Sequence, residues 1–275
     1  MPKVSICIPA YNAQAYLSEA VKSVLNQTFE DFELIILNNA SSDETEKIAT
    51  SYTDYRIKVY SNHNILPMAQ NWNAVMRYAS GEYVKLLCAD DRLHLDTLEK
   101  EVAALSQKGV VITVSDTNLI DLNNKSTGIL KHLNQKGLFE GKDVAHKNLL
   151  WRNYFGAPLN NLYRRKHFLQ VGGYDTTLSH VFDLDLAIRI ACMGKVYNFG
   201  EALCDFRVHS SAGTTKAMGE ERKQFVIDHL DMFNKHKEAK LYPITNTEIR
   251  WGVLMRKLRY DLGALYMKYI LRNES

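Results

Sequence analysis

The stretch VSICIPAYN, residues 4–12, opens the pattern that decides the fold. Within it, aliphatic side chains at every second position alternate with Ser5 and Cys7, which predicts a strand. The apolar side chains of residues 17–25 then recur at helical spacing. The aliphatic run LIIL at 34–37 is typical of a strand whose two faces are both covered. Strand and helix therefore alternate from the start of the chain.

This alternation continues through the first hundred or so residues. Ser41 and Glu44 form an S-x-x-E capping box, which predicts a helix that runs to about Tyr52. Further helices are predicted over 68–79 and 95–107, and further strands over 56–60, 83–87 and 109–114. Because parallel neighbours need crossover connections, this order predicts a doubly wound α/β fold, with a mostly parallel central sheet flanked by helices. Ligands in such sheets bind beyond the carboxyl ends of the strands.

The pattern is looser in the second half of the chain. Residues 116–140 look like an insertion with a hairpin turn at 121–124. Helices are predicted over 142–150 and 183–192, and short strands over 196–199 and 202–208. Beyond residue 217 the chain is predicted to be helical, with a break at Pro243.

The composition excludes several classes of protein. A chain of 275 residues with 46% hydrophobic side chains can bury a large core, so overall disorder is excluded. A net charge of +3 is too close to balance for a nucleic-acid binder. The four cysteines contain no C-x-x-C pair, so neither a zinc ribbon nor a redox dithiol is expected. We find no signal peptide and no apolar run of the ~20 residues needed to cross a bilayer, and we expect a cytoplasmic protein.

Two adjacent carboxylates, Asp90 and Asp91, directly follow the strand predicted at 83–87. That position is the ligand-binding edge of the sheet, and hard oxygen ligands there suit Mg²⁺ or Mn²⁺ on a phosphate group. The alternative is that these aspartates cap the helix that begins near Leu95. Position alone leaves both interpretations open.

Further motifs accompany this pair in a fixed order. They are PAYN at 9–12, NQTF at 26–29, NASSDET at 39–45, GEY at 81–83, ADD at 89–91, GGYD at 172–175, DLDL at 183–186 with Arg189, and FRVH at 206–209. The ordered set resembles the family 2 glycosyltransferases over roughly residues 3–215. The resemblance implies an inverting enzyme of the GT-A fold. It further implies a catalytic domain over 1–215, with a nucleotide-sugar part over about 1–115, an acceptor part over about 116–215 and a helical extension over 216–275.

The resemblance also assigns roles to single residues. It implies that Asp183 is the catalytic base and that Asp90 and His209 bind the metal, Mn²⁺ or Mg²⁺. The residues expected at the nucleotide-sugar donor are Pro9, Tyr11, Asn39, Asn71, Asp90, Asp91 and Arg207. Asn160 and Asn161 are expected near the acceptor. A UDP-sugar is the favoured donor, the acceptor is a glycan or a lipid-linked saccharide, and the setting is polysaccharide or glycoconjugate synthesis.

Two positions depart from the family pattern. Cys88 stands where the first aspartate of the D-x-D element is usual, and Asn39 replaces an aspartate of the base pocket. Asn39 still offers both donors and an acceptor to a pyrimidine edge. The departures leave open a second hypothesis, a GT-A-like sugar-binding protein with altered catalysis. A nucleotidyltransferase is a weaker alternative, because PAYN at 9–12 lacks the glycines and basic residues of their loops. The absence of G-x-G-x-x-G argues against a dinucleotide-dependent dehydrogenase.

Asp183 also has an interpretation of its own. In a single displacement, one carboxylate takes the proton from the acceptor hydroxyl as that oxygen attacks the anomeric carbon. Asp183 opens a predicted helix, so the alternative is that it caps this helix. Arg207 is expected to contact the diphosphate or to pair with a carboxylate.

The segment 250–272 has six basic residues and one acidic residue among apolar and aromatic side chains. A basic amphipathic helix of this kind suits an anionic membrane surface. We therefore expect peripheral contact with the cytoplasmic face of a membrane. The alternative is a helix that packs on the catalytic domain or on a second subunit.

Overall fold

The computed structural model describes residues 1–209 and 221–273, without the side chains of residue 260 and residues 262–273. Its strands are β1 (Val4–Ala10), β2 (Phe32–Asn38), β3 (Ile57–Ser61), β4 (Tyr83–Leu86), β5 (Arg92–Leu93), β6 (Val110–Ile120), β7 (Ser126–Leu130), β8 (Gly137–Glu140), β9 (Tyr163–Arg164) and β10 (Lys195–Arg207). Its helices are α1 (Leu17–Leu25), α2 (Thr45–Thr50), α3 (Met68–Arg77), α4 (Thr97–Leu105), α5 (Gly141–Leu150), α6 (Arg165–Gln170), α7 (Phe182–Ala191), α9 (Arg222–Glu238) and α10 (Asn246–Asn273), with a 3-10 turn at Pro158–Asn160.

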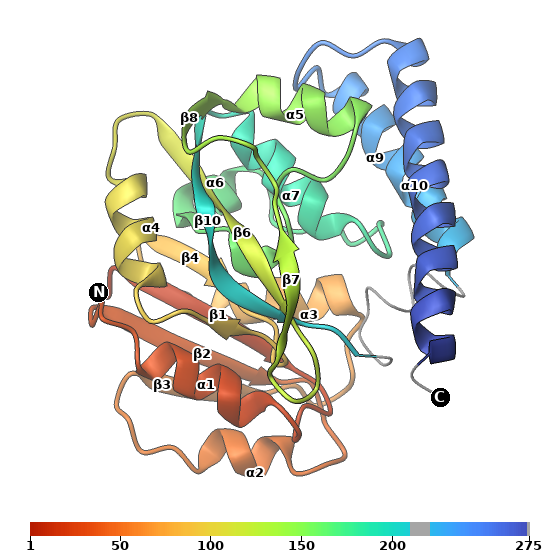
Figure 1. Cartoon of the computed structure of the whole chain (residues 1–275). Coiled ribbons are helices and arrows are strands. Elements are labelled where there is room, and N and C mark those ends of the chain that lie inside the picture. The colour runs from red at the N-terminus through yellow and green to blue at the C-terminus, as the bar shows by residue number, and fades with distance from the viewer. Residues whose placement is uncertain (210–220, 274–275) are drawn as a thin grey trace.

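One mixed sheet forms the centre of the molecule (Figure 1). The strand order is β3-β2-β1-β4-β9-β6-β10-β5, with β7 added beside β6 and β8 beside β10. The first four strands are parallel, and β6 is parallel to β10. The short strand β9 runs antiparallel between β4 and β6. The doubly wound, mostly parallel sheet predicted from the sequence is therefore confirmed.

Helices cover both faces of this sheet. Helices α1, α2 and α4 pack on one face, against the side chains of β1 and β2 at positions 4, 6, 8, 34 and 36. Helices α3, α5, α6, α7 and α9 share the core on the other face, which Cys7 and Ile35 also join. Successive side chains of a strand point to opposite faces, so the alternation in β1 supplies both cores.

Several local predictions differ from the structure. The capping box does not form: α2 begins at Thr45, and Gln14 Oε1 accepts the Glu44 N–H in place of the Ser41 side chain. The two strands predicted near 196–199 and 202–208 are one strand, β10, since β6 extends to Ile120 and pairs along it with register shifts. The hairpin turn at 121–124 is confirmed between β6 and β7.

The C-terminal helices pack on the rest of the chain. Met232 and Phe233 of α9 are fully buried in the core that contains α7. Helix α10 contacts α5 through Gly252 and Arg256, and the Arg256 guanidinium donates to the carbonyl oxygens of Leu149 and Asn148. Within residues 1–209 and 221–273, the structure contains no helix with the length and hydrophobicity to span a bilayer.

Candidate active site

The loops that follow β1 and β2 are joined to each other at the carboxyl edge of the sheet. The N–H of Asn12 donates to Ser41 Oγ at 3.0 Å, and Asn12 Oδ1 accepts the N–H of Ser42 at 3.0 Å. Asn12 and Ala40 have φ values of 47° and 53°, a left-handed conformation that costs a non-glycine residue free energy. Such strain is concentrated at functional sites, and here it shapes the edge where the sequence predicts nucleotide binding.

Asn39 and Asn71 lie together beside these loops. The Asn62 amide donates to Asn39 Oδ1 at 2.8 Å and to Asn71 Oδ1 at 2.9 Å, so it bridges the two. Asn39 also exchanges two hydrogen bonds with the backbone of Leu66. Both side chains are buried, while Tyr11 is about half exposed at 49%. Of the residues expected in the base pocket, Tyr11 therefore offers the open surface, and Asn39 fixes the 62–66 segment.

The acidic pair lies where β4 ends, as predicted. Ligand atoms of Cys88, Asp90 and Asp91 lie within 4.8 Å of one another. Asp90 Oδ2 is 3.0 Å from His209 Nε2, so β4 and the end of β10 meet here. Asp91 is 1% exposed, and its Oδ2 has no hydrogen-bond partner among the described residues. Burial and the charge of Asp90 raise the pKa of Asp91 well above its ordinary value.

Arg207 supports this pair from inside the protein. Its N–H donates to Asp91 Oδ1 at 3.0 Å, and its Nε donates to the Asp90 carbonyl oxygen at 3.0 Å. The rest of its guanidinium bonds to Glu19 at 2.8 Å and to Asn124 at 2.8 Å. Of the two roles expected for Arg207, the pairing with a carboxylate is confirmed, with Glu19 as the partner. Since Arg207 is 1% exposed, the direct donor contact is corrected: Arg207 holds the aspartate turn.

Asp183 lies in the first turn of α7. The N-cap of this helix is Val181, so the capping alternative for Asp183 is wrong. Burial raises the pKa of Asp183 to about 6, although the N–H of Leu184 donates to its Oδ1 at 2.8 Å. Burial also raises the pKa of the Cys88 thiol, and the Asp183 charge contributes to that rise. The Asp183 charge therefore acts on the Cys88 thiol, two residues before Asp90.

Asn160 and Asn161 require a correction. Asn160 is 0% exposed, and its amide donates to the backbone oxygen of Ser115 and to Thr117 Oγ1. Asn161 is 4% exposed and donates to the backbone oxygens of Thr113 and Phe155. Because both amides are used inside the fold, they join β6 to the neighbouring loop and are not available to an acceptor.

Sequence reasoning missed the residues that brace the site from α1. Glu19 forms ion pairs with Arg207 at 2.8 Å and with Arg92 at 3.4 Å. The Tyr16 ring lies 4.6 Å from the Arg207 guanidinium and 5.5 Å from the His209 ring. An acidic side chain on a surface helix has no signature of its own, and only the folded arrangement reveals these partners.

The sequence and the fold are similar to those of known proteins. Residues 5–172, more than half of the chain, match the family described as Glycosyl transferase family 2. The chain belongs to glycosyltransferase family 2. A glycosyltransferase of Rickettsia typhi is 31% identical to it over 221 residues, which cover 80% of this chain and 68% of the relative. GalNAc(5)-diNAcBac-PP-undecaprenol beta-1,3-glucosyltransferase of Campylobacter jejuni is 33% identical over 161 residues, 57% of this chain and 50% of that enzyme.

Solved structures share the fold of this family 2 chain at low identity. S. aureus TarS 1-349 in complex with UDP-GlcNAc matches with a TM-score of 0.67 and 16% identity, over 83% of this chain and 66% of that one. Mannosyltransferase PcManGT from Pyrobaculum calidifontis, in complex with GDP-Man and Mn²⁺, matches with a TM-score of 0.61 and 17% identity, over 99% and 79%. The GT-A fold predicted from the sequence is therefore confirmed.

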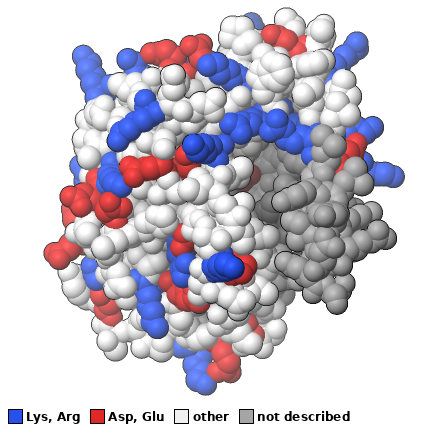
Figure 2. All heavy atoms as spheres, in the orientation of Figure 1, with Lys and Arg blue, Asp and Glu red and all other residues white. Residues whose placement is uncertain are grey.

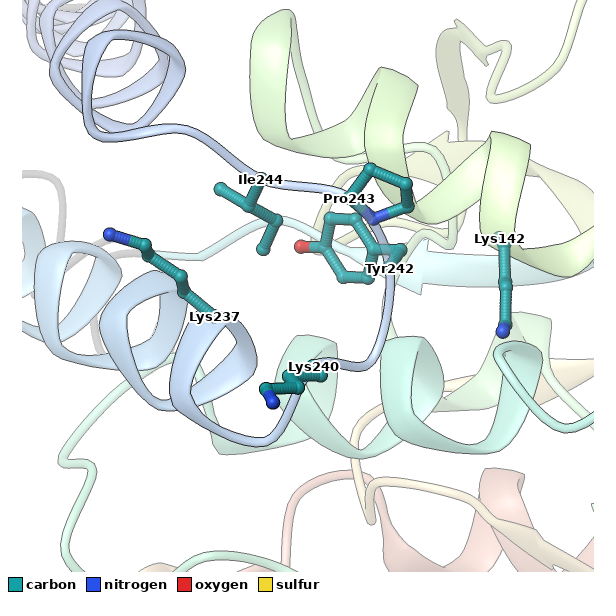
Figure 3. Close-up of a pocket in the computed structure, with 6 residues that line it drawn as sticks. All are labelled: Lys142, Lys237, Lys240, Tyr242, Pro243 and Ile244. Carbon is teal, nitrogen blue, oxygen red and sulfur yellow. The ribbon is translucent and has the colours of Figure 1, made fainter.

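Two cavities lie away from the catalytic edge of this glycosyltransferase. One of about 450 Å³ lies between α5 and the C-terminal helices and is lined by Lys142, Lys237, Lys240, Tyr242, Pro243 and Ile244 (Figure 3). A second of about 370 Å³ shares Lys142 and Lys240 with it. In Figure 3 the lysine amino groups point in different directions, so they do not form a converging anion site.

Proposed function

We propose that this family 2 glycosyltransferase moves a sugar, with inversion, from a nucleoside-diphosphate sugar to a hydroxyl of a glycan or lipid-linked acceptor. One observation carries the proposal: Asp183 is a partly buried carboxylate with a pKa raised to about 6, and its charge acts on Cys88 beside the acidic pair that follows β4. A base with a pKa near 6 is deprotonated at neutral pH and still accepts a proton. Donor binding is assigned to residues of about 1–115 and acceptor binding to about 116–215.

The residues at the end of β4 fit a divalent cation, Mn²⁺ or Mg²⁺. Asp90 supplies carboxylate oxygens, His209 a ring nitrogen, and the unpartnered Asp91 Oδ2 a further oxygen nearby. Oxygen-rich sets of this kind suit hard cations. A bound cation would stabilise the charge that grows on the diphosphate leaving group. Cys88 is a poor ligand for such a cation, so Asp90 and His209 are assigned as its ligands.

The reaction balances with one base. The acceptor oxygen attacks the anomeric carbon, the bond from that carbon to the diphosphate oxygen breaks, and the nucleoside diphosphate leaves. The hydroxyl proton moves to the Asp183 carboxylate. The Leu184 N–H bonded to Asp183 Oδ1 orients this carboxylate and leaves Oδ2 for the proton.

A UDP-sugar is the favoured donor, and a GDP-sugar is the alternative to be tested beside it. Similar structures are complexes with UDP-GlcNAc and with GDP-Man and Mn²⁺, which supports a nucleotide at this edge. Tyr11 offers the exposed ring on which a base stacks, next to Pro9. Cys88 cannot bond a ribose hydroxyl well, and Asp91, expected at the donor from the sequence, is 1% exposed, so a water molecule is assigned to that contact.

A lipid-linked acceptor on the cytoplasmic face of a membrane fits the outer face of α10. There Trp251, Leu254 and Leu258 are exposed, and the Trp251 ring contacts the ring of the equally exposed Trp151. Arg250, Lys257 and Arg259 of the same helix are exposed as well, and Figure 2 shows further Lys and Arg side chains in a row across the upper half of the molecule. Exposed tryptophans with neighbouring basic side chains suit an anionic interface. The relative from Campylobacter jejuni, by its name, acts on an undecaprenol-linked saccharide. The remaining side chains of the 250–272 segment, beyond residue 261, lie outside the described residues.

The same α10 also packs on α5, so the docking alternative and the membrane contact are compatible. Co-sedimentation with vesicles of phosphatidylglycerol and phosphatidylcholine tests the contact, with pure phosphatidylcholine as the control. Binding that falls with salt and with Trp251→Ser plus Leu254→Ser supports it. Equal behaviour of the variant and the wild type would overturn it.

The catalytic assignment is tested with Asp183→Asn and Asp90→Ala. Asp183→Asn should retain nucleotide binding and lose transfer by ~10²-fold or more, the scale of general-base catalysis. Asp90→Ala should weaken metal-dependent binding of UDP or GDP. A sugar-binding protein with altered catalysis would bind a nucleotide-sugar without releasing nucleoside diphosphate, in both wild type and variants.

A further inference from the structure

We propose that α9 is part of the catalytic apparatus, because its inner side chains position the segment that carries Asp183; this rests on the role proposed above for that residue. Asp228 is the central positioning residue. Helix α9 lies outside residues 5–172, which match the family. The evidence for its role is therefore the set of contacts that α9 makes in this chain.

Asp228 binds the backbone just before α7. Its Oδ2 accepts the N–H of Ser179 and the N–H of His180, both at 2.8 Å. Its Oδ1 accepts the Gln224 amide at 2.7 Å, so donors occupy both oxygens. Asp228 is 1% exposed. A buried carboxylate that accepts three hydrogen bonds fixes its partners more strongly than neutral groups do.

Two further α9 side chains bind on either side of this point. Lys235 donates to Asp175 Oδ2 at 2.6 Å, at the start of the segment. His236 Nε2 lies 2.8 Å from Asp185 Oδ1, two residues beyond the proposed base. Helix α9 therefore binds the chain before, within and after the turn that presents Asp183.

The two ends of the segment between Tyr174 and Asp185 are also bound by residues outside α9. Asn73 of α3 exchanges two hydrogen bonds with the backbone of Tyr174, and Arg189 of α7 donates to Asp185 and to the carbonyl oxygen of Gly173. Between Tyr174 and Asp183, the described side-chain hydrogen bonds from other elements come from α9. A displacement of about 1 Å of a catalytic group can cost ~10²-fold in rate. Loss of the α9 contacts should therefore lower turnover without removing the donor site.

Asp228→Asn is the decisive variant, because it removes the negative charge and leaves one oxygen where two accept hydrogen bonds. The NH2 group then faces either the N–H groups of Ser179 and His180 or the Gln224 amide. Asp231→Asn is the matched control: the same residue type and helix, with an exposed side chain. Hydrogen–deuterium exchange in the segment 176–185 is measured for both, together with turnover of UDP-GlcNAc and GDP-mannose with Mn²⁺. Asp228→Asn should speed exchange in that segment and lower kcat by ~10-fold or more, with donor KM within about twofold. Asp231→Asn should match the wild type.

Lys235→Met provides a milder variant if Asp228→Asn fails to fold, since the Lys235 side chain is 43% exposed. It should change exchange and kcat in the same direction by a smaller factor. Unchanged exchange and kcat in Asp228→Asn or Lys235→Met would overturn the proposal, as would a uniform rise of exchange over the whole chain. If Asp183→Asn keeps full turnover, the assignment of the base fails, whatever α9 does. If Asp183→Asn is inactive and Asp228→Asn is normal, only the positioning role fails.

Discussion

Replacement of Asp183 by asparagine should stabilise the protein while it removes activity. Burial raises the pKa of Asp183 from 3.8 to about 6, so the folded protein holds the charged form unfavourably at neutral pH. The shift of about 2 pKa units corresponds to roughly 3 kcal/mol of lost stability above pH 6, at 1.36 kcal/mol for each unit. Asparagine keeps an oxygen for the Leu184 N–H and carries no charge. For a chain of this size the gain is about 6 °C in Tm at about 2 °C for each kcal/mol.

The sign follows from the direction of the shift. A carboxyl group whose pKa is raised on folding contributes stability below its unfolded pKa of 3.8 and loses it as the pH rises through about 6. The variant does not titrate, so its advantage over the wild type should be largest above pH 6 and fall to about half at pH 5. Calorimetry at both pH values without metal or nucleotide measures this, with Asp231→Asn as the control. A Tm equal to or below that of the wild type at pH 7.5, or a difference independent of pH, would refute the reasoning.

Three other predictions concern the site and its support. Turnover under saturating substrate should rise with pH and level off above about pH 6, as Asp183 loses its proton; a profile without a rise between about pH 5 and 7 would contradict its role. UDP or GDP with Mn²⁺ should stabilise the wild type by about 2.7 kcal/mol when the nucleotide is at a hundred times its Kd, and Asp90→Ala should abolish this stabilisation. Equal stabilisation of both proteins would count against the metal assignment. Lys85→Met should lower the free energy of unfolding by about 3–5 kcal/mol in denaturant titrations, because Lys85 and Glu101 are both 0% exposed and pair at 2.9 Å. A loss below about 1 kcal/mol would mean that the Glu101 carboxyl is neutral.

Local patterns predicted most of the sheet and the edge where the site lies. The alternation in β1 and the aliphatic run in β2 reflect which faces of these strands are buried. This pattern is present in the sequence itself, so both strands could be predicted. The position of Asp90 and Asp91 followed from the rule that ligands bind at the carboxyl ends of parallel strands. Asp183 was found through a motif, whereas its electrostatic effect on Cys88 depends on the folded chain.

The mistakes have physical causes. Asn160 and Asn161 look like ligands for a sugar hydroxyl, but buried backbone oxygens of β6 use their amides first. Arg207 looks like a phosphate contact, but Glu19 lies on α1, far away in the sequence. The support from α9 was missed, since its Asp228 acts on backbone N–H groups, which leave no pattern in the sequence. Long-range hydrogen bonds of this kind depend on tertiary packing and not on local spacing.

The central claim is that Asp183 acts as the base in transfer from a nucleoside-diphosphate sugar. Its most direct test measures release of UDP, GDP or dTDP from the corresponding sugars with Mn²⁺, by wild type and Asp183→Asn in parallel, with a membrane extract as acceptor source. The wild type should release nucleoside diphosphate from at least one donor, and the variant should do so at a rate lower by ~10²-fold or more, with nucleotide binding unchanged. Equal rates for the two proteins, or no release from any donor, would contradict it.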